Sequence, residues 1–195
     1  MNLPNFLTMV RIVLAPVFMA LVIVDDVWAK FWAMILFIVA ALTDLFDGYY
    51  ARKYNISTSF GKFFDPLADK ILISLAFIAF VVLGYVQMWM VLLIILREFL
   101  ITGLRTLAAY RGALITPSLP AKIKTFLQMT SITVIMLIIN LRTFLPPLNI
   151  ESEWLQSSIP DEIIFWLMLA TVVITVGTGI DYLRRSYYLL RNTMK

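Results

Sequence analysis

The chain has 195 residues, of which 62% are hydrophobic, and its mean hydropathy is +0.91. A soluble domain is usually about 45–50% apolar, so this composition excludes a water-soluble globular protein and predicts one that lies in a membrane. No cysteine or histidine is present, which excludes disulfides, thiolate chemistry and imidazole sites. In such a protein the net charge of +4 indicates contact with anionic membrane lipids, and we expect no nucleic-acid partner.

Six apolar runs are long enough to cross a bilayer, which needs about 20 mostly apolar residues per helix. They leave only short connections, so we expect one domain over residues 1–195, an all-α integral membrane protein with six transmembrane helices. The first run lacks a basic leader and a small-residue cleavage site, and we expect it to be retained. The expected helices span residues 5–24, 31–54, 62–83, 87–111, 120–145 and 161–190.

Basic residues are distributed unevenly between the two ends of these helices. Of the 16 Lys and Arg residues, only Lys30 and Arg142 lie in or next to the connections that follow the first, third and fifth helices. The other 14 lie near the N-terminus, near the second and fourth connections, or near the C-terminal tail. Because cytoplasmic loops carry the excess of Lys and Arg, we expect both termini to be cytoplasmic.

Four aspartates interrupt the end of the second helix and the start of the third. Asp44 and Asp47 stand three residues apart and Asp65 and Asp69 four apart, so each pair shares one helix face. One aspartate facing lipid costs about 2.5–3.5 kcal/mol, so the group requires a polar cavity with cations. Antiparallel helices joined by a short turn would bring the four carboxylates together, where they could bind Mg²⁺ or Mn²⁺, two ions included.

Two neighbours of these aspartates suit a phosphate-bearing ligand. Gly48 keeps the face of Asp44 and Asp47 low, so that a ligand can lie against the backbone, and Arg52 can pair with a phosphate bidentately. The alternative interpretation is that the aspartates form an interfacial salt-bridge patch. We favour it less, because the four aspartates lie on two matched helix faces. The cations of that patch would be Arg52, Lys53, Lys62 and Lys70.

The segment 44–69 reads D-x2-D-G-x2-A-R-x8-G-x3-D-x3-D. All of its fixed positions match the signature of the CDP-alcohol phosphatidyltransferase family, which the chain resembles over most of its length. The resemblance implies an enzyme that moves the phosphatidyl group of CDP-diacylglycerol onto a small alcohol. It also implies that Asp44, Asp47 and Asp65 bind metal and that Asp69 is both a metal ligand and the catalytic base.

The same resemblance places the contacts of CDP-diacylglycerol. The two at the start of the first helix, Asn5 and Thr8, have a plainer alternative, because Asn5 can simply cap that helix, and the two roles can coexist. The implied contacts are Asn5, Thr8, Gly48, Arg52, Thr58 and Gly61.

Basic residues of the fourth and fifth helices bear on the acceptor. Arg97 and Arg105 are eight residues apart and so share a helix face, and Lys122 and Lys124 begin the fifth helix. Basic groups near a carboxylate site indicate a second, anionic substrate. Alternatively, Arg97 pairs with Glu98 or a lipid phosphate and the lysines only follow the charge rule of cytoplasmic loops. We favour that alternative for Lys124, but not for Arg97 and Arg105.

The sequence around these residues, including Arg97-Glu98-Phe99, resembles the bacterial branch of the family that makes phosphatidylglycerophosphate. This likeness implies glycerol 3-phosphate as acceptor, with its phosphate held by Arg97, Arg105 and Lys122. It also implies a bacterial inner membrane, with the site at the cytoplasmic face. Inositol phosphate, serine or another lipid remain open as acceptors, and a divalent-cation transporter remains the alternative outside enzymes.

Two further features concern the membrane and assembly. Gly177 and Gly179 permit close helix packing, and we expect a homodimer. Tryptophans near the expected helix ends predict an interfacial belt formed by Trp28, Trp32, Trp89 and Trp154.

Overall fold

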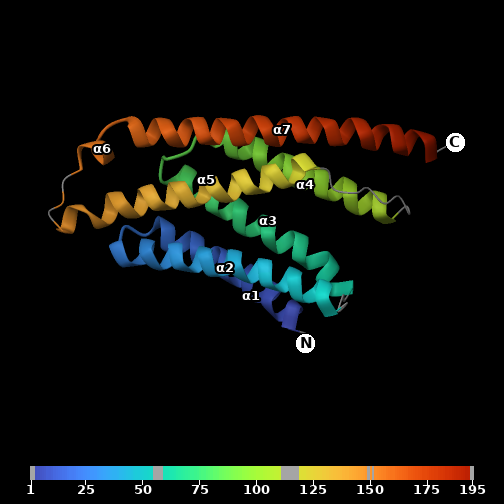
Figure 1. Ribbon diagram of the computed structural model, residues 1–195, viewed down its shortest axis with the longest axis horizontal. Coiled ribbons are helices and arrows are strands. Elements are labelled where there is room, and N and C mark those ends of the chain that lie inside the picture. The colour runs from blue at the N-terminus through green and yellow to red at the C-terminus, as the bar shows by residue number, and fades with distance from the viewer. Residues whose placement is uncertain (1–2, 55–58, 111–118, 149, 151, 194–195) are drawn as a thin grey trace.

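The computed structural model is a bundle of helices (Figure 1). The described residues contain no strand, which confirms the expected all-α class. The structure describes residues 3–54, 59–110, 119–148, 150 and 152–193. Within these ranges it does not describe the side chains of residues 3–5, 7, 44–54, 59–67, 69, 107–110, 119–122 and 185–193.

Six long helices follow one another in the described part of the chain, in the order that the sequence predicts, and their ends differ from the expected ones by at most four residues. Two short elements in the last connection, the 3-10 helix η1 (Pro146–Leu148) and α6 (Glu153–Gln156), were not predicted. The long helices are α1 (Leu3–Ile23), α2 (Val27–Tyr54), α3 (Ser59–Val82), α4 (Met88–Tyr110), α5 (Leu119–Phe144) and α7 (Ile159–Thr193).

Local capping explains two of the helix ends. The Asp26 carboxylate accepts a hydrogen bond of 2.7 Å from the backbone N–H of Ala29, so α2 begins earlier than its apolar run suggests. At the other end of α3, Gly84 has a φ of +79°. The N–H groups of Gly84 and Tyr85 bond the carbonyls of Val81 and Phe80, which is the Schellman arrangement that ends a helix on a left-handed glycine.

The long helices form two groups of three. In the first, α1 packs against α2 and α3, and in the second, α7 packs against α4 and α5. The groups meet where α3 contacts α4 and α5 and where α2 contacts α5. One buried apolar core runs through both groups, with Phe18 from α1, Phe80 from α3 and Met168 from α7 among its fully buried members.

The outer surface of the bundle is also apolar. Leu96, Phe126 and Trp166, on three different helices, each leave more than 60% of their surface exposed. A surface of this kind suits lipid and not water. Among the described residues, two segments are long and apolar enough to cross a membrane, Ile123–Leu148 and Ile159–Arg184. The other four spans and the interfacial role of the tryptophans stay predictions.

Both termini lie at one end of the bundle (Figure 1). The C-terminal end of α2 and the start of α3, which carry the four aspartates, lie at this same end, which we call the aspartate end. The arrangement agrees with a topology in which both termini face one compartment. That the compartment is the cytoplasm stays a prediction.

At the opposite end, Arg142 connects four elements. Its guanidinium donates to both carboxylate oxygens of Asp161 on α7, at 2.8 and 3.1 Å, and its Nε donates to the carbonyl of Leu155 on α6. The same guanidinium lies 5.6 Å from the ring centroid of Tyr85, in the turn between α3 and α4. A cavity of about 230 Å³ borders this contact, between that turn and the start of α7, far from the aspartate end.

Arg142→Ala should therefore loosen the end of the bundle opposite the aspartates. Because the partners are partly exposed, we expect a loss of only about 1 kcal/mol, which lowers Tm by about 2–4 °C. Thermal unfolding in detergent measures this shift. Glu153→Gln, a change at the same end of the bundle, is the matched control, and an equal Tm for the two variants would contradict the role of Arg142.

Candidate active site

The four aspartates predicted to bind metal lie on consecutive helices. Asp44 and Asp47 belong to α2, and Asp65 and Asp69 belong to α3, so the helical backbone that their spacing requires is present. Their side chains lie outside the described residues, and the meeting of the four carboxylates stays a prediction. No three acidic side chains gather among the side chains that the structure does describe.

The structure describes the side chain of only one of the predicted CDP-diacylglycerol contacts, Thr8. Thr8 is fully buried on α1, the helix that contacts both α2 and α3. Thr58 lies outside the described residues. The others lie on helices, but their side chains are not among those described: Asn5 on α1, Gly48 and Arg52 on α2, and Gly61 on α3.

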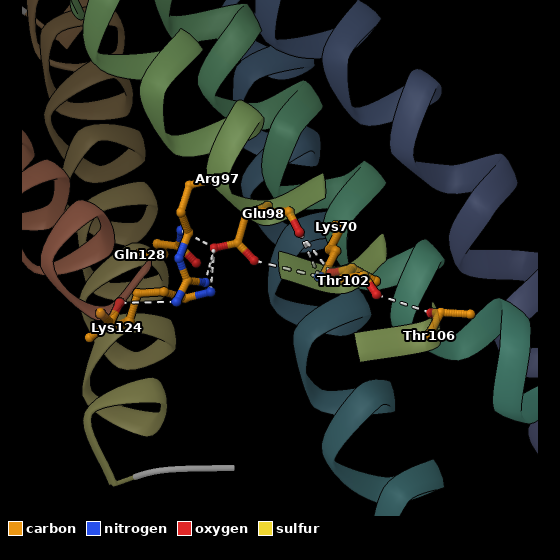
Figure 2. Close-up of polar contacts among 8 residues, drawn as sticks. Lys70, Arg97, Glu98, Thr102, Thr106, Lys124 and Gln128 are labelled. Carbon is orange, nitrogen blue, oxygen red and sulfur yellow. Dashed lines mark hydrogen bonds and ion pairs between the residues drawn. The ribbon is translucent and has the colours of Figure 1, made fainter. Parts of the chain in front are cut away.

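A buried carboxylate gathers cations from three helices (Figure 2). Glu98 on α4, with a side chain that is 8% exposed, lies 3.3 Å from Nη1 of Arg97 and 3.6 Å from Nζ of Lys70 on α3. Lys124 on α5 donates to the same carboxylate, as does Nε2 of Gln128 at 3.4 Å. We call these residues the Glu98 cluster: Lys70, Arg97, Glu98, Lys124 and Gln128.

The Glu98 cluster carries more positive than negative charge. Three cations surround one carboxylate, which leaves an excess of two positive charges in a largely buried place. Buried charges are costly unless they are paired, so this excess favours an anionic ligand. Lys70 directly follows Asp69 in the chain, so the cluster adjoins the aspartate segment.

A very small cavity lies inside the Glu98 cluster. Lys70, Glu98 and Gln128 line it together with Ser74 and apolar residues of α3 and α4, and its volume is about 10 Å³. That is room for about one water molecule. A ligand of several atoms must therefore bind at the edge of the cluster.

Arg97 and Arg105 lie along one face of α4, as predicted, and both meet α7. Nη2 of Arg97 donates to the Thr178 hydroxyl at 3.0 Å. The guanidinium of the exposed Arg105 lies 5.8 Å from the ring centroid of Tyr182. Lys122 is on α5, with a side chain outside the described ones. The binding of phosphate by these three basic residues stays a prediction.

Two expectations about pairing were wrong. Arg97 does pair with Glu98, and the two neighbours also reach other helices, Arg97 to Thr178 on α7 and Glu98 to Lys124 on α5. Lys124 is not a surface lysine but is buried on Glu98. Sequence reasoning also missed Glu98 as a site residue. The available signal was an acidic residue inside an apolar run, which in a membrane protein marks a functional or structural centre.

One glycine has a role within the chain that was not expected. Gly179 on α7 lies against Arg97, whose Cγ would be 2.9 Å from a Cβ at this position. Gly179 therefore no longer supports a dimer, and the homodimer stays a prediction.

A model of the family described as CDP-alcohol phosphatidyltransferase matches residues 1–177, which include both the aspartate segment and the Glu98 cluster. The chain belongs to the CDP-alcohol phosphatidyltransferase family. The resemblance drawn from the aspartate motif is thereby confirmed, and this phosphatidyltransferase belongs to a family of membrane-bound enzymes. Residues 178–195, including the Thr178, Gly179 and Tyr182 contacts, lie beyond the matched region.

Relatives match this phosphatidyltransferase over nearly its whole length. The CDP-diacylglycerol–glycerol-3-phosphate 3-phosphatidyltransferase of Bacillus subtilis strain 168 is 36% identical, over 98% of both chains. The protein of the same name from Rickettsia typhi is 39% identical, over 96% of this chain and 99% of its own. A probable phosphatidylglycerophosphate synthase of Mycobacterium tuberculosis is 36% identical, over 95% of this chain and 81% of its own.

Removing the central carboxylate should destabilise the phosphatidyltransferase strongly. In Glu98→Gln, three cations remain together without an anion, and breaking a buried pair in this way costs about 3–5 kcal/mol. We expect a fall in Tm of about 10 °C in detergent. The matched control is Glu162→Gln on the exposed start of α7. A Glu98→Gln protein as stable as this control would show that the cluster does not need its carboxylate.

Proposed function

We propose that this phosphatidyltransferase moves the phosphatidyl group of CDP-diacylglycerol onto glycerol 3-phosphate, giving phosphatidylglycerophosphate and CMP. The observation that carries the proposal is the likeness, over 96–98% of this chain, to proteins named for that reaction. The Glu98 cluster supports it, because its excess of positive charge suits an acceptor that is itself phosphorylated. Serine, a neutral zwitterion, would use that charge less well.

A divalent metal is part of the proposal. Asp44, Asp47, Asp65 and Asp69 would hold it, and their oxygen donors suit Mg²⁺ or Mn²⁺ in a chain without histidine or cysteine. The two pairs stand on helical backbone, each pair at a spacing that keeps it on one helix face. When bound, the metal neutralises the charge of the diphosphate.

The protein's own residues then bind both substrates and move one proton. Arg97, Arg105 and Lys122 bind the phosphate of glycerol 3-phosphate. Asp69 accepts the proton of the free primary hydroxyl, whose oxygen attacks the lipid-side phosphorus. A new P–O bond forms as the bond from that phosphorus to the CMP oxygen breaks, and CMP leaves with the electron pair. CDP-diacylglycerol is contacted by Asn5, Thr8, Gly48, Arg52, Thr58 and Gly61.

We further propose that the six long helices span a bacterial inner membrane with both termini and the aspartate end in the cytoplasm. The apolar outer surface and the shared end of the termini support this arrangement. CDP-diacylglycerol can then keep its acyl chains in the inner leaflet while its head group reaches the aspartates. The enzyme is proposed to act as a homodimer.

Purified protein with CDP-diacylglycerol, Mg²⁺ and labelled glycerol 3-phosphate should incorporate the label into lipid. EDTA should stop incorporation, and Asp69→Asn should lower kcat by about 10²–10⁴-fold with Tm retained, because a general base contributes about that much. Glu153→Gln, at the far end, serves as the control. Normal turnover in Asp69→Asn would remove this residue as the base.

Other outcomes of the same assay separate the alternatives. Release of CMP only with inositol phosphate, serine or another lipid alcohol would keep the family and replace the acceptor. No transfer to any alcohol, in folded protein that binds divalent metal, would favour the cation transporter.

The proposed topology can be tested with single cysteines, because the chain has none of its own. Gln156→Cys, in the connection between α5 and α7, should react with an impermeant maleimide added to intact spheroplasts. Lys195→Cys should react only after the membrane is opened. Labelling of both variants in intact spheroplasts would contradict termini in the cytoplasm.

A further inference from the structure

The last helix meets the proposed phosphate-binding face of α4 through one short segment. Thr178 contacts Arg97, Gly179 lies against Arg97, and Tyr182, one turn further on, lies beside Arg105. This segment begins where the family match ends, at residue 177.

Gly179 makes room for the side chain of Arg97. A Cβ at this position would lie 2.9 Å from Cγ of Arg97, closer than real Cβ atoms essentially ever approach a heavy atom, and 3.3 Å from its Nε, which is also a tight contact. The atoms that it would meet are Cγ and Cδ of the stem and Nε of the guanidinium, so a Cβ at position 179 would displace the guanidinium of Arg97. At Gly177, two residues earlier on the same helix, an added Cβ would meet no atom of another element within 4 Å.

Thr178 fixes the direction of the Arg97 guanidinium. Its hydroxyl donates to the carbonyl of Thr175 at 3.0 Å and accepts from Nη2 of Arg97 at 3.0 Å. A threonine hydroxyl has a single proton, so the bond to Thr175 turns a lone pair towards the arginine. With Nη1 on Glu98, the planar guanidinium is held from two sides.

Tyr182 supports the second arginine. The Arg105 guanidinium carbon lies 5.8 Å from the centroid of the Tyr182 ring, within the range of a cation–π contact. Thr178 and Tyr182 are four residues apart on α7, so they lie on one face of that helix. The same face of α7 thus meets both arginines.

We propose that Thr178–Tyr182 of α7 is a positioning segment, which holds Arg97 and Arg105 for the phosphate of the acceptor, with Gly179 as the residue that admits Arg97. This inference rests on the proposed function and adds α7 to its site. The segment touches neither substrate itself; it acts on acceptor binding through the two arginines.

The test compares Gly179→Ala with Gly177→Ala in the glycerol 3-phosphate assay. In Gly179→Ala, the KM for glycerol 3-phosphate should rise about tenfold, as expected when one oriented charge-assisted contact is lost, while the apparent KM for CDP-diacylglycerol stays within about twofold. Gly177→Ala should leave both constants unchanged. A general loss of structure would instead move both constants and kcat together.

A second pair of variants tests the same segment without placing a larger residue at position 179. Thr178→Val keeps the shape of the side chain but removes the acceptor of the Arg97 hydrogen bond, whereas Thr178→Ser keeps that acceptor. We expect the KM for glycerol 3-phosphate to rise in Thr178→Val and to return to its normal value in Thr178→Ser, at equal Tm.

The results distinguish failure of the positioning segment from failure of the proposed function. If the unmodified protein incorporates glycerol 3-phosphate and both Gly179→Ala and Thr178→Val keep its KM, the positioning segment is refuted and the proposed function stands. If the unmodified protein incorporates none, the proposed function is refuted and the positioning segment with it.

Discussion

A carboxylate buried among three cations decides how the helices can meet at the proposed site. Lys70, Arg97 and Lys124 come from α3, α4 and α5, and in an apolar bundle they could not approach one another without an anion between them. Glu98 supplies that anion: its carboxylate accepts from Arg97, Lys124 and Gln128 and pairs with Nζ of Lys70 at 3.6 Å. Arg97, one of the two arginines proposed to bind the acceptor, is placed by this ion pair on one side and by α7 on the other.

The order of the helices and most of their ends could be predicted because a membrane span leaves a long, continuous apolar run in the sequence. The exceptions are local. The early start of α2 depends on a cap formed by Asp26, and η1 and α6 occupy a polar connection in which no apolar period exists. The hydropathy of the sequence does not indicate a side-chain cap or a short helix in a polar connection.

The site could be predicted only where its residues lie close together in the sequence and share one helix. The aspartates stand on helices as their spacing required, and the shared face of Arg97 and Arg105 is confirmed. The burial of Lys124 and the pairing of Arg97 with Glu98 depend on which helices meet, which a pattern within one helix does not contain. The contact of α4 with Gly179 is likewise tertiary, since 82 residues separate Arg97 from that glycine.

The position of Lys70 has a consequence for how the two substrates would bind. Lys70 belongs to the same helix as Asp65 and Asp69, in the first group of three, but its partner Glu98 belongs to the second group. An anion that drew Lys70 away from Glu98 would break a salt bridge that joins the two groups of helices. If α3 responded to the loss of this salt bridge, an acceptor at the Glu98 cluster and a ligand at the aspartates would be thermodynamically linked, and by reciprocity each would alter the affinity for the other by the same factor.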